Sequence, residues 1–242
     1  MNQDAGSGPE LVAHRDHLPL LADPGHLSPD QPSPDQPRPH QPRPGSQHIS
    51  ALVGALSVLD TRLLDDWGHR LAALMKRGGR LLVAGSGGSA VQAEDFAAQF
   101  TGRVATGRRD HPAIALRGAV TAATAIAGNF SGHEEVFARQ VRSHGRPGDV
   151  LLAMSTSGRN HGLLRAVAAA RAGGIGAWCL TGPAPNPLAD ACDEVVCVYP
   201  AGARALSLTA TVREAHQVAL HLIRLSADAT ARASWEVPPP GA

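Results

Sequence analysis

The chain has 242 residues, of which 43% are hydrophobic, and its formal net charge is +1. That length allows one or two domains, and the nearly neutral charge balance gives no electrostatic argument for a nucleic-acid partner. No apolar run reaches the roughly 18 residues that span a bilayer, and no basic segment followed by an apolar one opens the chain. We therefore expect a soluble, cytoplasmic protein that binds neither nucleic acid nor membrane.

The three cysteines, Cys179, Cys192 and Cys197, have neither CxxC nor zinc-finger spacing. Free cysteines of this kind usually behave as small buried side chains in a reducing compartment. We interpret them in that way, in agreement with a cytoplasmic location.

Residues 1–47 hold ten of the nineteen prolines and no aromatic residue, and a five-residue Pro-containing repeat runs over residues 28–42. Such a segment buries too little apolar surface to offset the entropy of ordering, so we expect a disordered tail rich in polyproline II. A ligand for an SH3-type domain is one interpretation of this tail. An unselective solvated extension is the interpretation that we favour.

The ordered part begins with apolar residues at helical spacing, which predict one long helix over residues 49–75 that Gly78 and Gly79 end. From there strands and helices alternate. The expected strands are 80–84, 112–116, 150–155, 176–181 and 194–199, and the expected helices are 89–102, 119–127, 134–144, 161–172, 186–191 and 207–227.

Short apolar runs separated by helices indicate a parallel sheet that is covered on both faces. We predict one three-layer α/β/α sandwich with a five-stranded parallel sheet over residues 48–228. A flexible tail follows at 229–242, and the long first helix packs outside the sandwich or against a second subunit.

Two short loops of Gly, Ser and Thr follow expected strands. Gly85–Ser89 reads Gly-Ser-Gly-Gly-Ser, and Ser155–Gly158 reads Ser-Thr-Ser-Gly. In an open parallel sheet, ligands bind beyond the carboxyl ends of the strands, where the next helix offers free N–H donors to an anion. Ser and Thr are also ordinary helix caps, but two such loops in one domain favour a phosphorylated small molecule. The candidate ligands are Ser86, Gly87, Gly88, Ser89, Ser155, Thr156, Ser157 and Asn160.

The first loop also satisfies the dinucleotide pattern GxGxxG/A through Gly85, Gly87 and Ala90. That pattern requires an acidic residue after the next strand to bind the ribose, whereas Arg117 stands there. Arg117 is compatible with a 2′-phosphate, so NADP binding remains an alternative, although it leaves the second loop unexplained.

The last helix carries candidate acid and base groups. Glu214 and His221 are seven residues apart and hence on nearly the same face, and Arg213 and His216 flank them. Asp95 and its neighbour Glu94, on the helix after the first loop, are the other acid/base candidates, with solvated helix charges as the alternative interpretation.

These motifs, together with Thr101–Arg103, Gly128–Asn129 and Gly148–Leu151, come in the order found in sugar isomerase (SIS) domains. The sequence resembles the phosphoheptose isomerase branch of that family over about residues 50–226. The resemblance implies a homotetramer that interconverts sedoheptulose 7-phosphate and a heptose 7-phosphate at subunit interfaces. It also implies that the two loops bind phosphate or sugar hydroxyls, that Arg213 lies at a substrate-binding position and that His221 lies in the site.

Several positions depart from the family pattern. Asp95 stands where the family has a histidine, Gln99 replaces the catalytic glutamate and Arg213 replaces a glutamine. The family's aspartates fall on Gly118, on Phe130 and near Ala210. Of the divalent-metal site that the resemblance implies, with zinc as the metal, only His221 is unchanged, and Asp95 is a candidate replacement ligand.

Two functions follow from these observations. One is an aldose–ketose isomerase with Asp95, Glu214 or His221 as the base, since isomerisation needs a base and a group that polarises the carbonyl. The other is a phosphosugar-binding SIS module without catalysis that acts as a regulatory or assembly factor.

Overall fold

A computed structural model describes residues 43–101, 112–117, 132, 134–200 and 205–233, with side chains from Leu208 onward in the last range. Most of the expected N-terminal tail, the expected helix 119–127 and the family positions Gly118, Asn129 and Phe130 lie outside these residues. Among the described helices, none is both long and apolar enough to cross a membrane.

The centre of the fold is a sheet of five parallel strands in the order β2-β1-β3-β4-β5. The strands are β1 (Leu81–Gly85), β2 (Ala113–Leu116), β3 (Val150–Ser155), β4 (Gly176–Thr181) and β5 (Glu194–Cys197). Each begins within one residue of its expected position. The predicted α/β class with a five-stranded parallel sheet is therefore confirmed.

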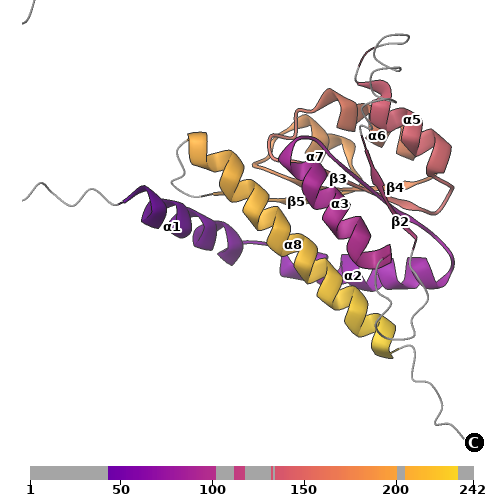
Figure 1. The fold of residues 1–242 in the computed structure, drawn as a ribbon, viewed down its shortest axis with the longest axis horizontal. Coiled ribbons are helices and arrows are strands. Elements are labelled where there is room, and N and C mark those ends of the chain that lie inside the picture. The colour runs from indigo at the N-terminus through magenta and orange to yellow at the C-terminus, as the bar shows by residue number, and fades with distance from the viewer. Residues whose placement is uncertain (1–42, 102–111, 118–131, 133, 201–204, 234–242) are drawn as a thin grey trace, which may run out of the picture. The chain divides into compact units, whose positions relative to one another are not determined.

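Helices cover both faces of the sheet (Figure 1). They are α1 (Pro44–Ser57), α2 (Thr61–Lys76), α3 (Gly88–Thr101), α5 (Glu135–His144), α6 (His161–Ala172), α7 (Pro187–Ala191) and α8 (Ala205–Ala233). Alternate residues of β1 belong to two separate hydrophobic clusters, because successive strand side chains point to opposite faces. Leu81 and Val83 pack with α1, α2, α3 and α8, whereas Leu82 and Ala84 pack with α5, α6 and α7.

The prediction of a single helix over residues 49–75 is wrong, because the segment forms two helices. α1 ends at Ser57, and Asp60 begins α2 by accepting a hydrogen bond from the Leu63 amide at 3.0 Å. Asp is a strong N-cap residue, which explains a new helix start at this point. α1 also begins at Pro44, five residues before the expected start, and α8 continues to Ala233, beyond the expected end of the domain at 228.

A packed aromatic pair fixes α2 against the sheet. The rings of Trp67 and Trp178 stack with centroids 4.9 Å apart, and Trp67 Nε1 donates to Glu194 at 2.9 Å. Arg70 lies over Trp178 and donates two hydrogen bonds to the same carboxylate, at 2.6 and 2.7 Å. Partial burial raises the pKa of Glu194, but the hydrogen bonds from Arg70 and Trp67 outweigh it and lower that pKa. These contacts fix α2 to β4 and β5, and α8 packs against α2.

Candidate functional site

The second loop connects the end of β3 to α6 in a tight turn. Ser155 is buried, and its hydroxyl accepts a hydrogen bond from the Gly158 amide at 3.0 Å. Gly158 has φ +64°, a conformation that glycine adopts without strain. Asn160 then begins α6 and accepts a hydrogen bond from the Leu163 amide at 3.0 Å. The sequence thus places Thr156 and Ser157 at a helix start, which suits an anion.

Asn186, at the start of α7, packs against this turn. Its side chain is buried, accepts a hydrogen bond from the Ala189 amide at 3.0 Å and donates to the Pro183 carbonyl at 3.1 Å. The Leu188 amide donates to the Gly158 carbonyl at 3.0 Å. A Cβ atom at position 158 would collide with Asn186, so glycine is required there for space as well as for its φ angle. The start of α7 therefore fixes the shape of the second loop.

A cavity of about 250 Å³ lies between the two loops. Five predicted hydroxyl-bearing residues and Asn160 line it, together with two residues that were not predicted: Ser86, Ser89, Met154, Ser155, Thr156, Ser157, Arg159 and Asn160. The structure thus brings together the hydroxyl groups of loops that are 66 or more residues apart in the sequence. Arg159 adds a cation, and its place directly after Ser-Thr-Ser-Gly is a signal that could have identified it. We call this space the loop cavity.

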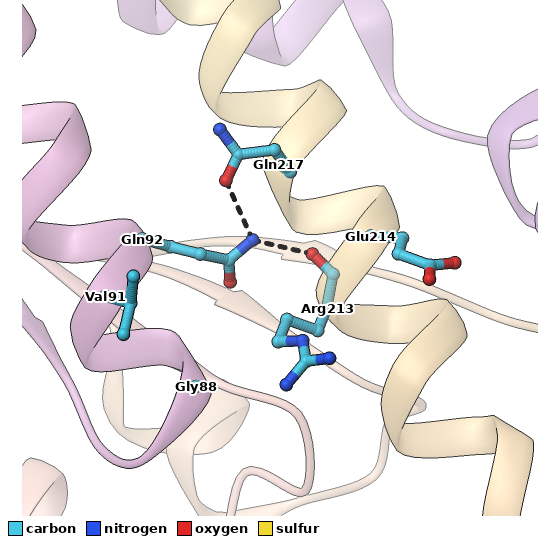
Figure 2. Close-up of a pocket in the computed structure, with 6 residues that line it drawn as sticks. All are labelled: Gly88, Val91, Gln92, Arg213, Glu214 and Gln217. Atoms are coloured by element: carbon cyan, nitrogen blue, oxygen red, sulfur yellow. Dashed lines mark hydrogen bonds between the residues drawn. The ribbon is translucent and has the colours of Figure 1, made fainter.

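A second cavity of about 360 Å³ lies between the start of α3 and α8 (Figure 2). It is lined by Gly88, Val91, Gln92, Arg213, Glu214 and Gln217. Gln92 joins the two helices, because its amide nitrogen donates to the Arg213 carbonyl at 2.8 Å and to Gln217 at 3.0 Å. We call this space the helix cavity. Loop Gly85–Ser89 borders both cavities, with Ser86 and Ser89 on one and Gly88 on the other.

The Glu214 side chain contacts α1. Its carboxylate lies 2.8 Å from His48 Nε2, and His48 Nδ1 lies 3.3 Å from the Thr211 hydroxyl. With the imidazole proton on Nε2, His48 donates to Glu214 and accepts from Thr211. No local pattern identifies His48, because 166 residues separate it from Glu214 and only the packing of α1 on α8 brings them together.

The histidines of α8 have different environments. His216 is fully buried, and burial lowers its pKa to about 4, so the ring is neutral near pH 7. The Thr181 backbone opposes this lowering of the His216 pKa but does not outweigh the burial. His221 is exposed and borders neither of the two cavities. Asp95 is also exposed, and its carboxylate accepts a hydrogen bond from the Gln99 amide at 2.7 Å.

The described residues do not offer a donor set for zinc. No group of three or more His, Cys, Asp or Glu side chains among them is placed to hold a metal ion. Arg213, at the family's glutamine position, has no lone pair to donate and carries a positive charge, and the Asp95 carboxylate already accepts from Gln99.

Comparisons with known proteins agree with this geometry. The family model described as the SIS domain matches residues 47–182. The phosphoheptose isomerase of Streptomyces coelicolor is 52% identical over 163 residues, which cover 67% of this chain and 68% of that protein. The enzyme of the same name from Campylobacter concisus is 34% identical over 183 residues, or 76% of this chain and 88% of that protein.

Solved structures of phosphoheptose isomerases are also similar to this chain. The phosphoheptose isomerase of Neisseria gonorrhoeae superposes with a TM-score of 0.64 at 30% identity, covering 76% of this chain and 95% of that one. The phosphoheptose isomerase of Francisella tularensis has a TM-score of 0.63 at 24% identity, which supports the fold. The chain therefore belongs to the SIS-domain family, in its phosphoheptose isomerase branch.

Proposed function

We propose that this protein is a phosphosugar isomerase that interconverts the ketose sedoheptulose 7-phosphate and a heptose 7-phosphate. The observation that carries the proposal is the loop cavity, where five hydroxyl-bearing residues and Arg159 converge at the ends of β1 and β3. Hydroxyls and a guanidinium at a helix start form a binding site for a phosphate monoester. Relatives named phosphoheptose isomerase at up to 52% identity support the activity, and the non-catalytic alternative is not favoured.

In this proposal Ser155, Thr156, Ser157 and Arg159 bind the phosphate, and the rest of the sugar extends along loop Gly85–Ser89. Glu214 removes the proton from the carbon next to the carbonyl. Glu214 is a suitable base because the residue lines the helix cavity and His48 orients its carboxylate. Gln99, at the family's glutamate position, cannot accept a proton as a carboxylate does.

We also propose that the active protein is a cytoplasmic homotetramer in carbohydrate metabolism. Support for assembly comes from exposed apolar side chains on α1, where Ile49 is 64% and Val53 60% exposed, and from Leu225 on α8, which is 51% exposed. Exposed His221 and Asp95 then contribute to a site at a subunit interface. A monomer in multi-angle light scattering would contradict the assembly.

The three cysteines are free thiols, as expected of a protein in a reducing compartment.

The test of the activity is direct. The full chain is incubated with sedoheptulose 7-phosphate, with and without added zinc, and aldose formation is followed. Turnover is expected, with kcat at least about 10²-fold lower in Glu214→Gln and in His221→Ala, and unchanged when residues 1–41 are removed. Binding without any turnover, even at high protein concentration, would refute the proposal in favour of a binding module.

A second experiment tests the phosphate site. The double variant Ser155→Ala with Ser157→Ala is expected to weaken phosphosugar binding, by a few kcal/mol at most, because hydrogen bonds to charged groups contribute roughly 1.5–3 kcal/mol each. Calorimetric titration measures the affinity. An unchanged dissociation constant would remove the assignment of the loop cavity to phosphate.

A further inference from the structure

Arg213 is an exposed cation that lines the helix cavity and has no counter-ion among the described residues. Its guanidinium lies against the start of α3, so that a Cβ atom at Gly88 would be 2.6 Å from Arg213 Nη1. The side chain makes no hydrogen bond or ion pair with any residue that the structure describes, and the carboxylate of the next residue, Glu214, points to the other side of α8, where it contacts His48 (Figure 2). Arg213 is exposed, so its charge is solvated, and the guanidinium and the positive end of the α3 dipole both favour an anion at this position. This position is therefore prepared for a negative charge.

A second, independent feature points to a ligand in the same cavity. Gln92 is only 8% exposed, and both bonds of its amide group are made by the nitrogen, which leaves Oε1 without a donor among the described residues. A buried carbonyl oxygen normally has a hydrogen-bond partner. Figure 2 shows this oxygen on the side of Gln92 that faces away from Gln217, toward the start of α3. A hydroxyl group bound beside Gln92 would supply the missing donor after a small shift of the amide, because the oxygen itself is covered.

We propose that Arg213 is the electrophile of the isomerisation and that it performs the task of a metal ion. This inference rests on the proposed function. An enediolate presents one negatively charged oxygen and a neighbouring hydroxyl, which match a free guanidinium and an unpaired carbonyl oxygen. The glutamine-to-arginine departure at position 213 then replaces a metal ligand by the cation itself.

The step balances without an oxidant or a co-reactant. Glu214 takes the proton from the carbon beside the carbonyl, and the electron pair of that C–H bond forms the C=C bond of the enediolate. The electrons of the carbonyl π bond move to the oxygen, where the Arg213 guanidinium binds the charge. The proton is returned to the former carbonyl carbon, and a proton moves between the two oxygens to complete the isomerisation.

The experiment uses the full chain after dialysis against a chelator, with residual metal measured by mass spectrometry. Metal-free protein is expected to keep its kcat, and Arg213→Gln is expected to lower kcat about 10²- to 10³-fold, as for the loss of one oxyanion donor. Guanidinium ion added to Arg213→Ala restores part of the rate. Arg232→Gln, an exposed arginine near the far end of α8, is the matched control and stays at the wild-type rate.

A binding measurement separates this inference from the proposed function. A phosphorylated sugar hydroxamate, which mimics the enediolate, is expected to bind at least tenfold more weakly to Arg213→Gln, while inorganic phosphate binds both proteins equally. Zinc-dependent turnover that chelation abolishes, or an unchanged kcat in Arg213→Gln, would overturn the role of Arg213 while leaving the isomerase intact. Absence of wild-type turnover would refute the isomerase, and unchanged hydroxamate binding would refute the role of Arg213.

Discussion

Replacing Gly158 by alanine tests whether the second loop depends on its contact with Asn186. The φ angle of +64° costs an alanine about 1–2 kcal/mol. The new methyl group also collides with the Asn186 amide, and its Cβ would lie 2.8 Å from that of Asn186. Moving Asn186 removes the cap of α7, which costs about 1 kcal/mol. We therefore expect Gly158→Ala to lower the free energy of unfolding by about 2–4 kcal/mol.

Gly78→Ala is the matched control, because Gly78 has φ +81° and nothing lies within 4 Å of the position that a Cβ atom would take. It should cost only the backbone strain, about 1–2 kcal/mol. Urea unfolding of both variants at one protein concentration gives the two free energies, provided that the slope m is unchanged. Equal losses in the two variants would refute the collision with Asn186. Wild-type phosphosugar affinity in Gly158→Ala would show that the loop geometry does not matter for binding.

Two further predictions concern stability. The pKa of His216 is 6.5 in the unfolded chain and about 4 in the folded one, so the unfolded chain binds an extra proton between these pH values. The contribution of His216 to the free energy of unfolding is therefore complete above pH 6.5. It decreases by about 3 kcal/mol in total as the pH falls to 4. Urea titrations from pH 4 to 7.5 check this, and the difference between wild type and His216→Phe should change only within that window. Asp60→Ala should cost about 1 kcal/mol through loss of the α2 cap, whereas the exposed neighbour Arg62→Ala should cost less than about 0.5 kcal/mol; equal losses would exclude a capping role.

The sheet could be predicted because its signals are local. The three central strands, β1, β3 and β4, are mostly apolar runs that are buried on both faces, and Gly, Pro or polar residues separate the strand-like runs. The break between α1 and α2 was missed for the opposite reason. Leu59 and Leu63 keep helical spacing across the interruption, so the apolar periodicity continues where the backbone does not. The capping preference of Asp60 was the signal to weigh against it.

The loop cavity was predictable and the helix cavity was not. The hydroxyl groups of the loop cavity follow strand ends, and parallel strands bring their carboxyl ends to one edge. The contacts of Arg213 with Gly88, and of Glu214 with His48, depend instead on how α8 lies against α3 and α1. On a helix wheel Glu214 and His221 share a face, yet the first is held by α1 and the second is exposed, because the neighbours of α8 change along its length.

The loop cavity and the helix cavity differ in their dependence on α8. The residues matched by the family model end at Gly182, and they include every residue that lines the loop cavity. Arg213 and Glu214 lie beyond that boundary on α8, and their surroundings include α1. A substitution on α8 can therefore change the chemistry while the phosphate site stays intact, since no residue of α8 lines the loop cavity. An arginine at position 213 is therefore compatible with a protein that keeps the phosphosugar substrate of its family but uses a different electrophile.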